Sequence, residues 1–141
     1  MADGNSRIQL QCLAEMKFAD AVLLLEHQRF SNAYYLAGYS LELGLKACIA
    51  KQIIAETIPP RRFINDVNTH DLEKLIAAAG LKQALREKQD QDQTFQAYWG
   101  LAGDWSPEVR YESVDAMAAQ LLLKAVGDPM NGILPWIKTV W

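Results

Sequence analysis

The chain has 141 residues, a usual size for one domain and enough to bury a core without disulfides or metals. Apolar residues make up 50% of it and charged residues 22%, as in a globular protein. The net charge of −3 excludes the general attraction to phosphate backbones that a basic protein has, so any nucleic-acid site must be local. We predict a single domain over residues 1–141.

The expected location of the protein and the redox state of its cysteines are inferred from sequence features that are missing. No segment is apolar and uninterrupted over the about 18 residues that a membrane span requires. Residues 1–7 lack the basic patch and short apolar run of a secretion signal, so we expect a cytoplasmic protein without membrane contact. Cys12 and Cys48 have no companion at CxxC or metal-binding spacing, and we predict that both are reduced core residues.

Two long helices are predicted first. Residues 6–27 favour an amphipathic helix because apolar residues recur at spacings of three and four. Its apolar stripe consists of Ile8, Cys12, Met16, Ala19 and Leu23, widened by Leu13 and Leu24. Ser31 or Asn32 can cap a second helix, which is predicted to run to about Thr57 because Pro59–Pro60 then stop it.

The rest of the chain favours shorter helices. A loop is predicted over 59–68, and Thr69 is predicted to cap a short helix that Gly80 ends. Strong helix formers predict an exposed, weakly amphipathic helix over 81–101, and apolar periodicity predicts a last long helix over 113–126.

The C-terminal end is rich in large apolar side chains. All four tryptophans lie there, at positions 99, 105, 136 and 141. We expect the tail, residues 132–138, to dock on its own bundle or on a second subunit. Because no run alternates apolar and polar residues over the length of a strand, the predicted fold is all-α: an antiparallel up-and-down helical bundle of four to five helices with a docked C-terminal tail.

The second helix carries more polar residues than a core helix needs. Residues on a helix are about 100° apart, which places Tyr35, Tyr39, Glu42 and Lys46 along one side. Glutamate one turn before lysine is the favourable order for an ion pair, and the phenols can donate hydrogen bonds. This polar seam either fixes how the helices pack or forms the wall of a ligand groove.

The opposite side of the second helix carries small residues. They are Ala33, Ala37, Ser40, Gly44 and Cys48. Small side chains let a neighbouring helix backbone approach closely, and we expect the gain in packing to offset the low helix propensity of Gly44.

The segment from Ala33 to Ala47, AYYLAGYSLELGLKA, resembles the second-helix signature of the HEPN domain family of prokaryotes. The segment from His70 to Leu75 is similar to the start of that family's following helix. Trp105, Arg110–Tyr111 and the tail 132–141 are similar to the C-terminal part of one subgroup. The resemblance covers most of residues 10–141. It implies a dimeric four- or five-helix bundle that often works beside a minimal nucleotidyltransferase, or as an RNA-cleaving toxin in defence systems.

The ribonuclease branch of that family carries an arginine, four to six intervening residues and a histidine, and each subunit supplies half of a metal-independent site. Here seven residues separate Arg62 from His70 and eight separate Arg61 from it, in a predicted loop. No histidine follows Arg110. The nuclease role therefore does not transfer residue by residue.

Three hypotheses remain. The first is a non-catalytic homodimeric module that binds RNA, a nucleotide or a partner nucleotidyltransferase through Tyr35, Tyr39, Glu42, Lys46, Arg110 and Tyr111. The second is a degenerate ribonuclease site assembled across a dimer, in which His70 handles the proton and Arg110 stabilises the phosphorane charge beside Tyr111. The third is a purely structural dimer whose seam only sets specificity.

Each candidate residue also has a plain structural interpretation. His70 can hydrogen-bond at a helix start or pack in the core. Arg110 can pair with Glu108, Glu112 or Asp115 on the surface. We predict no metal and no cofactor, because neither histidine has a companion at ligand spacing and no phosphate-binding glycine loop occurs.

Overall fold

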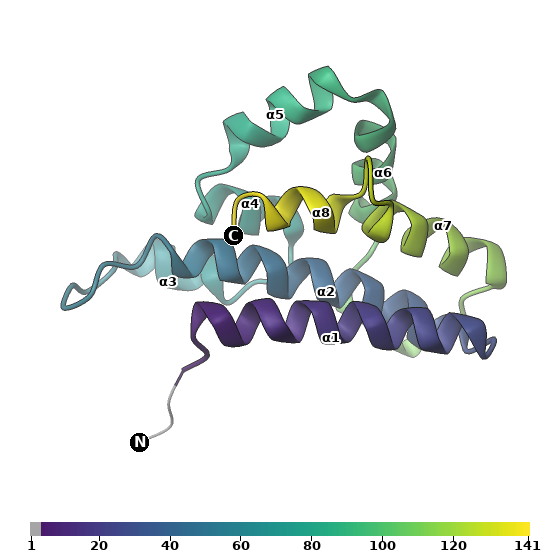
Figure 1. Cartoon of the computed structure of the whole chain (residues 1–141). Helices are drawn as coiled ribbons and strands as arrows, with labels where there is room; N and C mark the ends of the chain where they lie inside the picture. Colours follow the sequence, from purple (N-terminus) through teal and green to yellow (C-terminus); the bar gives the residue numbers. More distant parts are fainter. Residues whose placement is uncertain (1–3) are drawn as a thin grey trace.

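A computed structural model describes residues 4–141, and this part of the chain contains helices and no strand (Figure 1). The elements are α1 (Arg7–Glu26), α2 (Phe30–Ala50), α3 (Arg61–Val67), α4 (Leu72–Ala78), α5 (Lys82–Gln91), α6 (Gln93–Gly103), the 3-10 helix η1 (Pro107–Tyr111), α7 (Ala116–Gly127) and α8 (Ile133–Lys138). The all-α prediction is confirmed, with more short helices than the four to five expected. The prediction that the N-terminus carries no secretion signal rests on residues 1–7, of which residues 1–3 lie outside the described residues. No helix within 4–141 is both long enough and apolar enough to cross a membrane.

The base of the fold is an antiparallel pair, α1 and α2, which lie side by side along their length (Figure 1). α1 begins with a capping box, in which the Ser6 hydroxyl accepts from the Gln9 N–H at 3.2 Å and the Gln9 side chain accepts from the Ser6 N–H at 2.7 Å. Gln28, at φ 60°, makes the tight turn into α2. The predicted first helix is confirmed at both ends to within one residue.

The face of α1 that meets the core is the one opposite the predicted apolar stripe. Leu10, Ala14 and Ala21 are buried, whereas the side chains of Ile8, Met16 and Leu23 are 67%, 59% and 54% exposed. Ala19 and Cys12 are exposed too, so the prediction of a core position was wrong for Cys12 and correct for Cys48. The alanines of α1 allow a closer approach to α2 than the larger stripe residues would.

α2 begins and ends differently from the prediction. Neither Ser31 nor Asn32 caps it: the residue before it, Arg29, makes no side-chain cap, and the Ser31 hydroxyl accepts from the Val114 N–H at 2.9 Å. The helix ends at Ala50, well before Thr57. The predicted loop contains α3, because Pro60, with φ −57°, precedes a helix as readily as it stops one.

Aspartates begin three of the later helices. Asp71, and not Thr69, caps α4 by accepting from the N–H groups of Glu73 and Lys74 at 2.9 and 3.2 Å. The predicted helix over 81–101 is split at Asp92, whose carboxylate accepts from the Phe95 N–H at 2.9 Å and starts α6. Asp115 caps α7 in the same way. The break at Asp92 lets α6 turn Phe95 into the core.

The small residues of α2 lie where residues of the C-terminal half of the chain pack closely against this helix. All five predicted small positions are buried. A Cβ atom on Gly38 would lie 2.3 Å from the Trp105 indole, and one on Gly44 would lie 3.1 Å from Ile137 Cγ2. The tail therefore docks on its own bundle, as α8, with Ile133, Leu134 and Ile137 buried. Glycine at both positions permits these close contacts.

The connection between α7 and α8 is tied to α6 by aspartates. The Tyr98 hydroxyl donates to Asp128 Oδ2 at 2.8 Å, and the Asn131 side-chain amide donates to Asp92 Oδ2 at 2.8 Å. The hydrogen bond from Asn131 is the main reason why the pKa of Asp92 lies below its ordinary value, and the Phe95 N–H adds to it.

We expect Gly38→Ala to lower the free energy of unfolding by about 1–3 kcal/mol, because the new methyl group must displace the Trp105 indole. Gly100→Ala is the control, since a Cβ there meets nothing within 4 Å, and it should raise stability by up to about 1 kcal/mol through helix propensity. Urea unfolding followed by circular dichroism measures both. Equal effects of the two variants would contradict this packing role of Gly38.

The Asp92 carboxylate predicts an acid-sensitive fold. Its pKa is lower in the folded than in the unfolded state, so the charged form stabilises the fold at neutral pH, and this contribution is lost as the pH falls through the folded-state pKa. We expect Asp92→Asn to make the free energy of unfolding fall less steeply between about pH 5 and pH 2. Asp90→Asn, an exposed change on α5, should leave the slope unchanged. A slope unaltered by Asp92→Asn would show that the hydrogen bonds to Asp92 contribute nothing to acid unfolding.

Candidate functional site

The polar seam of α2 centres on a buried carboxylate. The side chain of Glu42 is 1% exposed, and both of its oxygens have partners. Glu42 Oε2 lies 3.3 Å from Lys46 Nζ, one turn along α2, and Glu42 Oε1 lies 2.7 Å from His70 Nδ1. Burial of a carboxylate is costly unless it is paired and hydrogen-bonded, and these two contacts meet that need.

His70 is oriented by this contact. It lies just before α4, and its side chain is 56% exposed although its Nδ1 is held by Glu42. The second ring nitrogen, Nε2, is therefore the one available to a ligand or to a proton in transfer. A carboxylate on Nδ1 fixes the orientation of an imidazole and favours its Nδ1–H form. The structural interpretation of His70 was a hydrogen bond at a helix start or packing in the core. The structure instead shows its ring paired with the Glu42 side chain.

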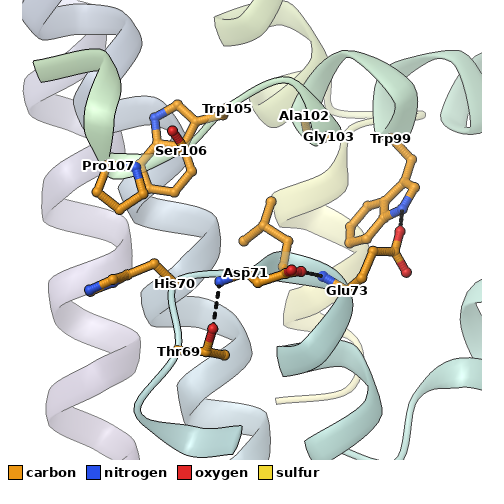
Figure 2. Close-up of a pocket in the computed structure, with 11 residues that line it drawn as sticks. Thr69, His70, Asp71, Glu73, Trp99, Ala102, Gly103, Trp105, Ser106 and Pro107 are labelled. Atoms are coloured by element: carbon orange, nitrogen blue, oxygen red, sulfur yellow. Dashed lines mark hydrogen bonds between the residues drawn. The ribbon is translucent and has the colours of Figure 1, made fainter.

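A cavity of about 580 Å³ opens beside His70 (Figure 2). Three segments line it: Thr69–Glu73 at the start of α4, residues Trp99, Ala102 and Gly103 of α6, and Trp105–Pro107 leading into η1. Its volume lies within the range of about 300–1,000 Å³ that is usual for small-molecule sites.

The cavity walls combine indole rings with carboxylates. Trp99 Nε1 donates to Glu73 Oε1 at 2.7 Å, which fixes that carboxylate on the wall (Figure 2). Asp71 adds a second carboxylate, used to cap α4. Among residues 4–141, no lysine or arginine lines the cavity. Its polar groups therefore favour a ligand that donates hydrogen bonds over a bare anion.

Trp105 links the cavity to the seam. Its side chain is buried on Gly38, and its ring centroid lies 6.3 Å from that of Tyr35. Tyr35 in turn stacks on Tyr39 at 6.0 Å. Burial, the charge of Glu42 and the neighbouring Tyr35 all raise the pKa of Tyr39. Within residues 4–141, Trp105 Nε1 is a buried side-chain donor with no hydrogen-bond partner, which costs about 1–3 kcal/mol.

Arg110 and Tyr111 lie at the end of η1, whose first residue, Pro107, lines the cavity. Both are exposed, and the guanidinium lies 5.0 Å from the centre of the Tyr111 ring. The neighbouring phenols of Tyr111 and then of Tyr35 raise the pKa of Arg110. Arg110 forms no ion pair in the described part of the chain, so the salt bridge offered as its structural role is not found.

The structure brings the predicted site residues of α2 together, whereas His70 and Arg110 belong to other elements. Tyr35, Tyr39, Glu42 and Lys46 share one side of the unbroken helix α2, as predicted. Arg110 lies near enough to Tyr35, on this side of α2, for that phenol to raise its pKa. Within one chain, no hydrogen bond of the described residues links His70 to Arg110, which the ribonuclease hypothesis brings together across a dimer.

Two contributors to the cavity escaped the sequence analysis. Glu73 and Trp99 are 26 residues apart and meet only because α4 and α6 pack near one another. No local pattern in the sequence signals this pair, because it depends on how two separate helices pack.

Comparisons with known proteins identify no relative. The chain matches no family model, no curated protein and no solved structure. The HEPN resemblance of the α2 segment therefore stays a prediction, and the function must be argued from the site itself. Among residues 4–141, no group of three or more His, Cys, Asp or Glu side chains is arranged to hold a metal ion.

We expect Lys46→Met to lower the free energy of unfolding by about 1–3 kcal/mol, because it removes the cation from a carboxylate that is 1% exposed. Lys138→Met is the control: Lys138 pairs with Glu15 at 2.9 Å, but those side chains are 41% and 54% exposed, so the loss should stay below about 1 kcal/mol. Thermal and urea unfolding at pH 7 measure both. The reverse order would mean that burial of Glu42 does not depend on Lys46.

Proposed function

We propose that this protein is a non-catalytic module that binds a nucleotide or a short RNA segment at the cavity beside His70. One observation carries the proposal: an imidazole held at 2.7 Å by a fully buried carboxylate stands at the edge of a 580 Å³ cavity walled by tryptophans. A structural ion pair alone does not require an exposed imidazole next to an open cavity. Convergent polar groups in an apolar pocket are the usual form of a ligand site.

The chemistry of the walls suggests how such a ligand lies. The carboxylates of Glu73 and Asp71 accept hydrogen bonds, so they suit the exocyclic amino group of a base such as adenine or cytosine. The same carboxylates repel a phosphate. The phosphate is therefore directed to the opening, where His70 Nε2 can donate to it if that nitrogen carries a proton.

Arg110 and Tyr111 supply a place for a second nucleotide. Tyr111 is 76% exposed and can stack on a base, while the Arg110 guanidinium can bind a phosphate with paired hydrogen bonds. Both are on η1, the element that begins at the cavity wall. A small basic and aromatic spot of this kind is compatible with a chain whose net charge is −3.

The resemblance of α2 adds partners to the proposal. It implies a homodimer in the cytoplasm that works beside a minimal nucleotidyltransferase, in a toxin–antitoxin or defence setting. A nucleotide site beside His70 fits a partner that transfers nucleotides.

A metal-independent ribonuclease is the second candidate, and the Glu42–His70 pair is the observation that favours it. A carboxylate on Nδ1 would leave Nε2 to accept the proton of a ribose 2′-hydroxyl as it attacks the phosphorus. Arg110 of a second copy would then stabilise the charge that develops on the phosphorane, with Tyr111 beside it.

Fluorescence anisotropy of a labelled mixed-sequence RNA oligonucleotide tests the binding module. We expect His70→Ala and Arg110→Ala each to weaken binding by about 10-fold, the usual effect of losing one charge-assisted hydrogen bond. Arg61→Ala, an exposed change on α3, should leave the affinity unchanged. Raising the salt concentration should weaken wild-type binding, and less so in Arg110→Ala.

The same samples separate the rival functions. RNA cleavage in EDTA that disappears in His70→Ala would favour the ribonuclease. If neither RNA nor mononucleotides bind at about 100 μM protein, both nucleotide proposals fail. The structural interpretation then stands, provided that Glu42→Gln alters stability alone.

A further inference from the structure

The loop that joins α2 to α3 exposes isoleucine side chains to solvent. Every residue from 51 to 58 is exposed, and Ile53, Ile54 and Ile58 are 49%, 70% and 94% exposed. Ile64, on α3, is 44% exposed as well. The loop lies beyond the end of α2, at the left of the view in Figure 1. Single exposed apolar side chains are ordinary, but isoleucines gathered in one loop form a patch that indicates a site of association.

The loop is built to leave water at low cost. A hollow of about 190 Å³ beneath it is lined mostly by apolar side chains, among them those of Ile53, Ile58 and Phe63. Both donors of Thr57 are satisfied inside the loop, because its hydroxyl and its N–H donate to the Ile54 carbonyl at 2.7 and 3.3 Å. These donors therefore keep a partner in an apolar environment, where an unpaired polar group is costly.

Cationic residues flank the loop on both sides. Lys51 precedes the isoleucines, and Arg61 and Arg62 follow them at the start of α3. All three are exposed, and neither arginine forms an ion pair among residues 4–141. Glu56 is the one carboxylate in the sequence from 51 to 64, although the net charge of the whole chain is −3. The loop is thus an apolar and cationic end on an acidic protein.

This combination favours one kind of partner. A lipid bilayer offers an apolar layer beneath anionic headgroups, so it can cover a projecting apolar loop while the flanking cations stay among the phosphates. A single-stranded nucleic acid fits less well, because residues 51–62 include no aromatic ring on which a base could stack. A second copy of the loop would bring arginines close to arginines.

We propose that the α2–α3 loop attaches this protein to a membrane surface rich in anionic phospholipid, with Ile54 and Ile58 in the acyl region and Lys51, Arg61 and Arg62 among the headgroups. The expectation of no membrane contact rested on the lack of a spanning segment and of a leader, and neither bears on attachment to a surface. The cavity beside His70 is lined by other segments, so this proposal and the nucleotide proposal can fail separately.

Cosedimentation of the full chain with vesicles tests the attachment. We expect binding to phosphatidylcholine vesicles that contain about 30% phosphatidylglycerol, and binding at least about 10-fold weaker to pure phosphatidylcholine. Ile58→Glu places a carboxylate in the acyl region and should weaken binding at least about 10-fold, with an unchanged circular dichroism spectrum. Met130→Glu is the matched control. It changes the net charge equally at a side chain that is 82% exposed outside the loop, so the affinity should stay within about two-fold.

The arginines have a matched control of their own. The double variant Arg61→Ala/Arg62→Ala should weaken binding to the anionic vesicles about 25-fold, since each cation near such a surface contributes about five-fold. The double variant Lys82→Ala/Arg86→Ala removes the same charge from exposed positions on α5 and should have little effect. Raising the salt concentration should weaken binding of the wild type.

A fluorescent label reports whether the loop enters the bilayer. In a Cys12→Ser background, Ile54→Cys provides one exposed thiol, because Cys48 is buried and burial raises its pKa to about 11. A polarity-sensitive dye on that thiol should shift its emission to shorter wavelength when anionic vesicles are added. The same dye at Gln96→Cys, an exposed position on α6, should not shift.

Three results would overturn the proposal. The first is a wild-type chain that does not bind anionic vesicles at about 1 mM lipid, as expected if an acidic protein covers the loop instead. The second is vesicle binding that Ile58→Glu leaves unchanged. The third is a dye at position 54 whose emission does not respond to vesicles, because the chain would then meet the membrane through another surface.

Discussion

The arrangement of the site depends on one buried carboxylate. Glu42 sits in an otherwise apolar stretch of α2 and is stable there only because Lys46 and His70 contact its two oxygens. One of these contacts lies within the helix, and the other joins α2 to the segment that begins α4. The ion pair therefore does more than satisfy a charge. It places the imidazole, and with it the first wall of the cavity, at a defined position on the bundle.

The other walls follow from close packing on the same helix. Gly38 lets the Trp105 indole lie directly on the α2 backbone, and Gly44 does the same for Ile137 of the docked tail. α2 is thus the element on which the seam, the cavity and the C-terminal helices are all assembled. Its unusual mixture of glycine, tyrosine and charged residues reflects these several contacts. A helix that buries only one apolar face has no need of them.

Side-chain periodicity predicted the positions of the long helices well, but it predicted poorly which face of a helix packs against the rest of the chain. The bounds of α1 and the common side of Tyr35, Tyr39, Glu42 and Lys46 were correct, because both depend on the local 3.6-residue repeat. The inward face of α1 could not be predicted in the same way. Its exposed stripe is as apolar as a core face, and the helix buries the opposite side, where Ala14 and Ala21 fit closely against the bundle. An apolar face indicates burial without saying whether the covering surface is in the same chain or in another.

What the sequence determined by itself is therefore local: an all-α chain, the long helices, and the side of α2 that carries the seam, since each follows from propensity and from spacing along one helix. Only the tertiary structure decided that Glu42 meets His70, that Glu73 meets Trp99, and that the tail docks on Gly44 of its own chain. Those pairs are far apart in the sequence, and they form because several helices must share one core at the same time. The geometry of that shared packing is a property of the assembled bundle and of no single segment.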